Sequence, residues 1–147
     1  MTVPAHLSLV TLGVVNVPRA SGFYQSLGWP KLPSSGDQIS FLQVGAVVLS
    51  LYERAALADD AGVDVSGQGF RATSLGINLP SPAHVDAAVS TWAAAGGSIV
   101  KQPCSVFWGG YSGYVADLDG HLWEIAFNPH SPEWAAVVPA ESAEVQR

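Results

Sequence analysis

The same order of elements occurs in both halves of the chain, and this repetition constrains the fold more than any other feature. In the first half, an apolar strand over Leu7–Val15 precedes a helix that ends at Gly28. In the second half, a strand over Ala72–Leu79 precedes a helix that begins at Ser81-Pro82. Pro in the first turn and Gly after the last turn are typical helix boundaries. We therefore expect two similar modules.

Further strands follow each helix. The alternating or apolar stretches that predict them are Trp29–Leu32 (the weakest), Ile39–Val44, Ala46–Tyr52, Ser98–Lys101, Tyr111–Asp117 and His121–Phe127. Each half then reads as βαβββ. Residues Glu53–Gly69 form a linker, in which an Ala-Ala-Leu-Ala segment predicts a helical turn or two.

Size and composition exclude several classes of protein. A chain of 147 residues is long enough for one domain of two modules, here residues 1–130, followed by a tail over 131–147. In that tail, Ser131-Pro132-Glu133 is typical of the start of a short helix. A net charge of −6 with no basic stripe argues against nucleic acid as a partner.

The chain is expected to be cytoplasmic, with no membrane partner. Its single cysteine, Cys104, excludes an intrachain disulfide and fits a reducing compartment. No apolar run approaches the roughly 20 residues of a membrane span. The apolar stretch near the N-terminus has no Lys or Arg before it and no small-residue cleavage site after it, which argues against export.

The segment Asp117–Glu124 joins a turn to a strand that carries a carboxylate. Asp119-Gly120 is a strong hairpin signal, because Gly accepts the positive φ of a tight turn. The strand after it is expected to be buried, with Glu124 at its centre. A buried carboxylate implies a metal, a partner or a chemical task.

Three segments carry a resemblance to the vicinal oxygen chelate superfamily of glyoxalases, extradiol dioxygenases and fosfomycin or bleomycin resistance proteins. One of them, residues 107–114, resembles a subgroup signature rather than a superfamily one. Residues 10–14 with Phe23-Tyr24-Gln25-Ser26-Leu27-Gly28-Trp29 match its first strand and the "FYxxLGW" end of its helix. Asp117–Glu124 matches its "DPDGxxxE" ending, with Leu118 in place of Pro. The resemblance covers about residues 7–129.

The resemblance implies an α+β fold and an oligomeric state. Two βαβββ modules, about 7–53 and 70–129, would form one curled, mixed eight-stranded sheet. This sheet is a cup with its helices on the outer face. Family membership also implies a homodimer.

In metal-dependent relatives, the first and last strands of each module each supply one ligand. These places fall at Leu9, Ser50, Ser74 (Thr73 if the register differs by one) and Glu124. Leucine cannot bind a cation, and serine is a poor ligand for the divalent metals of such sites. We therefore expect the chain to belong to a subgroup that lacks most of these metal ligands. We expect it to have no metal site and no cofactor.

Strand alternation divides the side chains between two faces. The residues that share the face of Glu124 would line the cup: Leu9, Thr11, Gly13, Val48, Ser50, Tyr52, Ser74, Gly76, Asn78, Leu122 and Ala126. The opposite set would face the helices: Val10, Leu12, Val14, Leu49, Leu51, Leu75, Ile77, Trp123, Ile125 and Phe127. Only the second set is uniformly apolar.

The cup lining suits a small organic ligand, because it is apolar with a few placed polar groups. The candidate ligand-binding residues are Thr11, Ser50, Tyr52, Ser74, Asn78, Trp108, Tyr111 and Tyr114. The last three alternate with Gly109, Gly110 and Gly113, and the sequence leaves open whether they form a pocket wall or pack structurally.

Glu124 has three interpretations: a relic of a metal site hydrogen-bonded to Ser50, Ser74 or Tyr52, a contact to a ligand, or a catalytic general base. We therefore expect a metal-independent protein that binds a small molecule, as bleomycin resistance proteins do by sequestration. The alternative is a glyoxalase-type lyase, isomerase or dioxygenase that uses Glu124 as the base or as its sole recognisable metal ligand. An inert interaction module is less favoured, because its core would not need Glu124.

Overall fold

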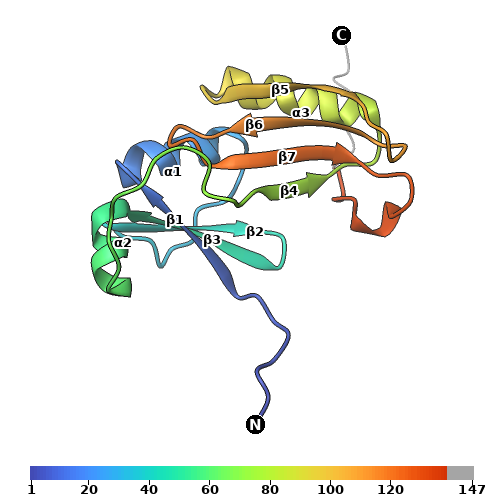
Figure 1. Ribbon diagram of the computed structural model, residues 1–147. Helices are drawn as coiled ribbons and strands as arrows, with labels where there is room; N and C mark the ends of the chain where they lie inside the picture. The colour runs from blue at the N-terminus through green and yellow to red at the C-terminus, as the bar shows by residue number, and fades with distance from the viewer. Residues whose placement is uncertain (139–147) are drawn as a thin grey trace.

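The computed structural model describes residues 1–138 and has an α+β fold (Figure 1). Its elements are, in chain order, β1 (Leu9–Val14), α1 (Val17–Ser26), β2 (Ile39–Val44), β3 (Val47–Glu53), α2 (Arg54–Ala61), β4 (Leu75–Asn78), α3 (Pro82–Ala94), β5 (Ser98–Ser105), β6 (Tyr111–Ala116), β7 (Leu122–Phe127) and the 3-10 turn η1 (Pro132–Trp134). Within these residues, none of the helices has the length and apolar character that crossing a membrane requires.

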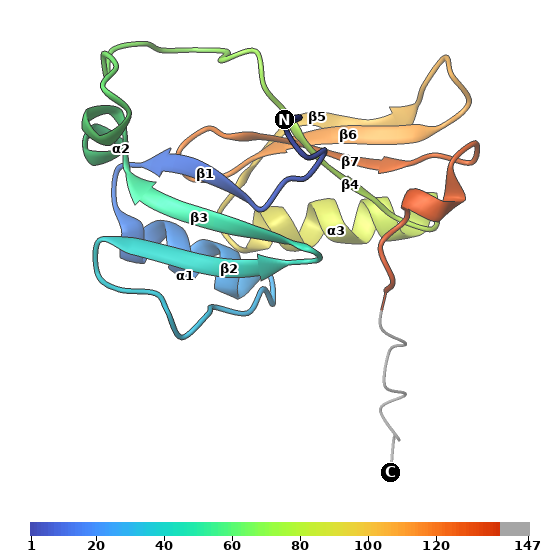
Figure 2. The same ribbon diagram turned by 90° about the horizontal axis from the view of Figure 1, so that it is seen from below.

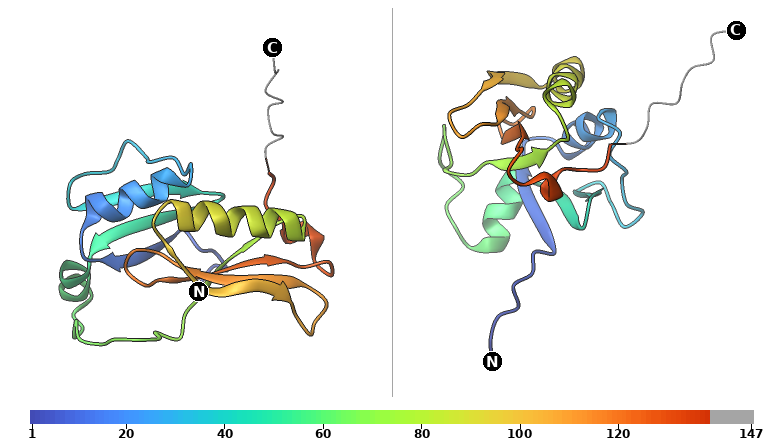
Figure 3. Two further views of the ribbon diagram at one scale, coloured as in Figure 1. Left: turned by 90° about the horizontal axis from the view of Figure 1, so that it is seen from above. Right: turned by 90° about the vertical axis from the view of Figure 1, so that its right-hand side faces the viewer.

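The strands form two sheets, ordered β1-β3-β2 and β4-β7-β6-β5. In each sheet the first strand of the half pairs in parallel with its last strand, and the remaining pairs are antiparallel. Helix α1 packs on the first sheet and α3 on the second. Figures 2 and 3 show both helices on the same side of the sheets, as the prediction of helices on an outer face requires.

The single eight-stranded sheet that we expected is not confirmed, because residues 1–138 contain seven strands in two separate sheets. The weakest predicted strand, Trp29–Leu32, makes only one isolated bridge, between Lys31 and Leu42. Pro30 and Pro33 surround that bridge, and proline has no backbone N–H to continue a ladder. The segment therefore follows the edge of β2 without becoming a strand.

Two other predicted elements are present, one of them longer than predicted. The strand predicted over Ser98–Lys101 runs on to Ser105, with register shifts along its pairing to β6. The predicted helical turns in the linker form α2, whose first backbone N–H groups donate to the Glu53 carboxylate. Gly62 then ends α2 in the left-handed conformation, with φ of 70°.

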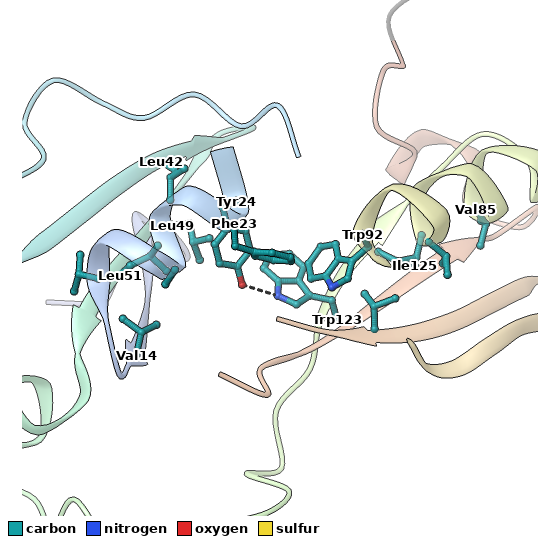
Figure 4. Packing of buried hydrophobic residues seen from close by; sticks show 14 residues of the cluster. Val14, Phe23, Tyr24, Leu42, Leu49, Leu51, Val85, Trp92, Trp123 and Ile125 are labelled. Carbon is teal, nitrogen blue, oxygen red and sulfur yellow. Dashed lines mark hydrogen bonds between the residues drawn. The ribbon is translucent and has the colours of Figure 1, made fainter. Parts of the chain in front are cut away.

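One hydrophobic core lies between the helices and the sheets. All ten residues that the alternation assigned to the helix-facing side are buried in it or packed against it. Figure 4 shows aromatic rings from both halves meeting there, with Phe23 and Trp92 centroids 5.3 Å apart. The Trp123 indole N–H donates to the Tyr24 hydroxyl over 3.2 Å. The two halves therefore share one core.

Candidate ligand-binding site

Glu124 lies at the middle of β7, on the face turned away from α1 and α3. Its neighbours Trp123 and Ile125 point into the core, so alternation directs Glu124 to the opposite side. Its side chain is half-buried rather than fully buried. The fully buried carboxylate of this segment is instead Asp117, which is 5% exposed. The prediction that Glu124 is a buried carboxylate was therefore wrong.

Asp117 holds the turn between β6 and β7 together. Its Oδ1 accepts the backbone N–H groups of Asp119 and His121, at 2.9 and 2.8 Å. Its Oδ2 accepts the Tyr24 hydroxyl at 2.6 Å. Burial, together with the nearby Asp117 charge, raises the pKa of Tyr24 far above its ordinary value. Asp117 is therefore a structural carboxylate that fixes where β7, and with it Glu124, begins.

Glu124 is hydrogen-bonded to Tyr114, its direct cross-strand partner on β6. The Tyr114 hydroxyl donates to Glu124 Oε2 over 2.8 Å. This hydrogen bond, with a smaller contribution from burial, raises the pKa of the Tyr114 phenol. Because the bond uses Oε2, Glu124 Oε1 can accept a donor from a ligand.

The register extends this pair into a row across the second sheet. Lys101 on β5 lies opposite Tyr114, and Gly76 on β4 lies opposite Glu124. A side chain at position 76 would meet nothing closer than the Glu124 backbone oxygen, 4.0 Å away, so the surface beside Glu124 is open. The sequence argument named Tyr114 and Glu124 separately. The hairpin signal at Asp119-Gly120 would not have paired them, because a two-residue loop there places Tyr114 opposite Ile125, whereas the observed loop has three residues, 118–120, between Asp117 and His121.

The four positions that correspond to the family's metal ligands do not fit a divalent metal. Leu9 lies half-exposed at the start of β1, Ser50 is buried in β3, and Ser74 lies exposed just before β4. With Glu124 they supply one carboxylate, two neutral hydroxyls and a hydrocarbon side chain. Across residues 1–138, no three His, Cys, Asp or Glu side chains come together as a possible metal site.

The predicted ligand-binding residues are spread over several places. Thr11 lines a cavity of about 240 Å³, Tyr52 a second of about 390 Å³, and Asn78 a third of about 100 Å³. Ser50 is buried opposite Thr11 in the pairing of β1 with β3, and Ser74 lies exposed just before β4. Sequence alternation alone did not reveal that these residues line different cavities.

Two of the predicted aromatic residues make structural contacts. Tyr111 lies on the opposite face of β6 and donates its hydroxyl to Asp86 Oδ1 of α3, over 2.6 Å. This hydrogen bond raises the pKa of Tyr111. The Trp108 ring packs directly against Gly110, where any side chain would collide with it. Only Tyr114, of the three aromatic candidates, contacts Glu124.

The cavity lined by Thr11, which we call the seam cavity, lies where the two sheets meet. Its walls come from β1, β4, the start of β7 and the linker: Val10, Thr11, Leu12, Gly69, Phe70, Arg71, Thr73, Leu75, Gly120, His121 and Leu122. Figure 2 shows the linker from α2 to β4 on the side away from α1 and α3. Leu122, two residues before Glu124, joins this cavity to the Glu124 face.

Comparisons with known proteins agree with this geometry. The family described as the Glyoxalase/Bleomycin resistance protein/Dioxygenase superfamily matches residues 6–125. Among solved structures, a glyoxalase-related enzyme from Fulvimarina pelagi is 32% identical, with a TM-score of 0.76 over 86% of this chain and 90% of that one. No curated protein matches the chain.

More distant structures share the fold. A glyoxalase/bleomycin resistance protein/dioxygenase family enzyme from Burkholderia phytofirmans PsJN is 22% identical, with a TM-score of 0.71 over 84% of this chain and 98% of that one. A lactoylglutathione lyase from Agrobacterium tumefaciens is 19% identical, with a TM-score of 0.65 over 85% and 95% of the two chains.

Proposed function

Because the chain belongs to the Glyoxalase/Bleomycin resistance protein/Dioxygenase superfamily, we propose that it is a metal-independent member that binds a small organic molecule. The ligand lies on the face of Glu124. It places a hydrogen-bond donor or a cationic group against Glu124 Oε1, and its apolar part enters the seam cavity beside Leu122.

The hydrogen bond between Tyr114 and Glu124 carries this proposal. In a metal site, Glu124 would share a cation with three other donors, whereas here Leu9, Ser50 and Ser74 occupy those places. The Tyr114 hydroxyl instead orients the carboxylate and leaves one oxygen for a ligand. Gly76 keeps the neighbouring surface open.

A thermal-shift screen tests this proposal with glycopeptide antibiotics, fosfomycin, hemithioacetals and catechols. We expect at least one class to raise the melting temperature, and Glu124→Gln to remove that rise while the unliganded protein melts normally. Glu133→Gln, a charge-matched change in η1, should leave the rise intact. No stabilisation by any class, or equal losses in both variants, would contradict the proposal.

Enzymatic activity is the second candidate, because the 32% identical relative is called a glyoxalase-related enzyme. In that case Glu124 acts as a general base, taking a proton from the substrate while Tyr114 orients it. Glu124→Gln would then abolish turnover without changing substrate affinity by more than a small factor. Sequestration alone requires that no product forms with the wild-type protein.

We also propose that the protein is a cytoplasmic homodimer, as members of this family are expected to be. Light scattering coupled to gel filtration tests the dimer. A mass of about twice the 15.3 kDa chain would support it, and the mass of one chain would contradict it.

A further inference from the structure

A further pocket, beyond the end of β1, carries a concentration of positive charge. It has a volume of about 270 Å³ and is lined by Gly13, Val15, Arg19, Arg54, Arg71, Leu118 and Asp119. We call it the arginine pocket. The whole chain has only six Lys and Arg residues and a net charge of −6, yet three of its arginines line this one pocket.

The three arginines come from segments far apart in the sequence. Arg19 lies in the first turn of α1, Arg54 begins α2, and Arg71 belongs to the linker before β4. One carboxylate, Asp119, shares the lining, and its Oδ1 already accepts the Val15 backbone N–H over 2.9 Å. Three like charges around one small volume repel one another, and the single carboxylate of Asp119 offsets only part of that repulsion.

Arg54 is held in place by the linker. Its Nη2 donates to the backbone oxygens of Val65 and Gly67, over 2.9 and 2.7 Å. A guanidinium has five N–H donors, so the Nε and Nη1 hydrogens remain for a ligand. The stem of Arg54 also packs over Gly13, where a side chain would be in contact with it.

Arg71 is positioned through His121. His121 Nε2 lies 2.7 Å from the Gly13 carbonyl oxygen, which can only accept, so Nε2 carries the hydrogen. His121 Nδ1 then accepts from Arg71 Nη1 over 3.3 Å. This chain of contacts ties Arg71 to the end of β1 and leaves its other donors available.

Arg71 also lines the seam cavity, so the two cavities adjoin at this side chain. Apolar side chains, Phe70, Leu75 and Leu122 among them, also line the seam cavity. A molecule that occupied both would need a charged head and an apolar body. Arginine is suited to carboxylate and phosphate oxygens, because its planar fork donates two parallel hydrogen bonds.

We infer that the arginine pocket binds the oxyanion of a small organic acid, whose apolar body extends into the seam cavity. The oxyanion end of this site is distinct from Glu124, because a carboxylate there repels an anion and attracts a donor, and the two ligand positions share only the seam cavity. The inference rests on the three arginines and His121, so the benzoate titration tests it separately from Glu124.

An amide chemical-shift titration tests this inference, with benzoate, inorganic phosphate and benzyl alcohol as probes at constant ionic strength set by chloride. Benzoate should give saturable shifts at Gly13, Val15 and Leu118. Benzyl alcohol, which lacks the charge, should leave these amides unmoved. Phosphate should shift the same amides with weaker affinity, because it has no apolar body.

Charge-removing variants show which residues are responsible. Arg71→Gln and Arg19→Gln should each weaken benzoate binding about tenfold, as the loss of one charge-assisted contact implies. Lys31→Gln makes the same charge change elsewhere and should alter the affinity by less than about twofold. The loss of benzoate binding in the arginine variants is a readout separate from the thermal shift that Glu124→Gln should remove, so failure of this inference is separable from failure of the proposed function.

Three results would overturn the inference. The first is an unchanged benzoate affinity in both arginine variants. The second is an equal loss in Lys31→Gln, which would indicate attraction by overall charge alone. The third is phosphate binding at least as tight as benzoate binding, which would remove the apolar body from the site.

Discussion

The Tyr24 hydroxyl joins three parts of the molecule at one atom. It donates to Asp117 in the β6–β7 turn and accepts from Trp123 on β7, while its ring lies in the core on α1. Because Asp117 is buried, water cannot solvate its carboxylate, and these hydrogen bonds take the place of that solvation. The position of the β7 strand, and therefore of Glu124, depends on this contact.

We predict that Tyr24→Phe lowers the free energy of unfolding by about 2 kcal/mol, because a buried hydrogen bond to a charged group is lost without a large change in shape. Urea denaturation measures the loss. Tyr111→Phe removes a similar bond, to the exposed Asp86, and should have a much smaller effect. Equal losses in the two variants would mean that burial of Asp117 does not determine the strength of the contact.

At the scale of elements, two glycines should respond oppositely to alanine. Gly97 joins α3 to β5 at a point where a side chain would collide with the Trp92 indole and lie 2.8 Å from the Ala116 oxygen. Gly22 lies within α1, and a side chain there would meet nothing within 4 Å. The glycine at position 97 therefore allows α3 to approach the sheet, and the one at position 22 has no such role.

Gly97→Ala should accordingly destabilise the protein by about 1–3 kcal/mol through overpacking. Gly22→Ala should stabilise it by about 0.5–1 kcal/mol, because alanine favours the helix. Thermal or urea unfolding measures both changes. A neutral Gly97→Ala would show that Trp92 can move aside, which would contradict the tight contact of α3 with β5 and β6.

The cap of α2 should depend on pH. The backbone N–H groups of Ala55 and Ala56 lower the pKa of Glu53 below its ordinary value. A depressed pKa means that the cap contributes fully above the ordinary pKa of Glu and is lost as the pH falls through the lowered value. The amide shifts of Ala55 and Ala56 should therefore change together in acid, and Glu53→Gln should abolish that change. Amides that do not titrate in the wild type would rule out the cap.

At the scale of the whole molecule, the shared aromatic core couples the two halves. Phe23 from the first half contacts Trp92 from the second, and Trp29 lies 5.4 Å from Trp123, centroid to centroid. The two sheets have no hydrogen-bonded ladder between them, so this core and the β6–β7 turn carry the connection.

We therefore predict that both halves unfold in one transition. Phe23→Ala should lower the free energy of unfolding by about 3–5 kcal/mol. The urea midpoint of unfolding should fall by the same amount whether the transition is followed by amide signals of β3, in the first half, or of β6, in the second. Two separate midpoints would show that the halves are independent domains.

Sequence reasoning predicted the features that depend on neighbours along the chain. Alternation identified the helix-facing residues because its period is fixed, and Pro18, Pro82 and Gly28 mark helix ends through their own backbone preferences. It failed where contacts between segments far apart in the sequence determine the structure. The approach of Arg19, Arg54 and Arg71 depends on the path of the linker, which no local pattern encodes. The strand expected near Lys31 failed because its prolines outweigh its apolar pattern.

Elemental analysis of the purified protein tests metal-independent binding. One carboxylate, already bonded to Tyr114, lies where relatives would place a metal ligand set. We therefore predict far less than one Zn, Ni, Fe or Mn per chain, after expression in medium that contains these metals. One equivalent of any of them, lost in Glu124→Gln and retained in Glu133→Gln, would contradict metal-independent binding at this site.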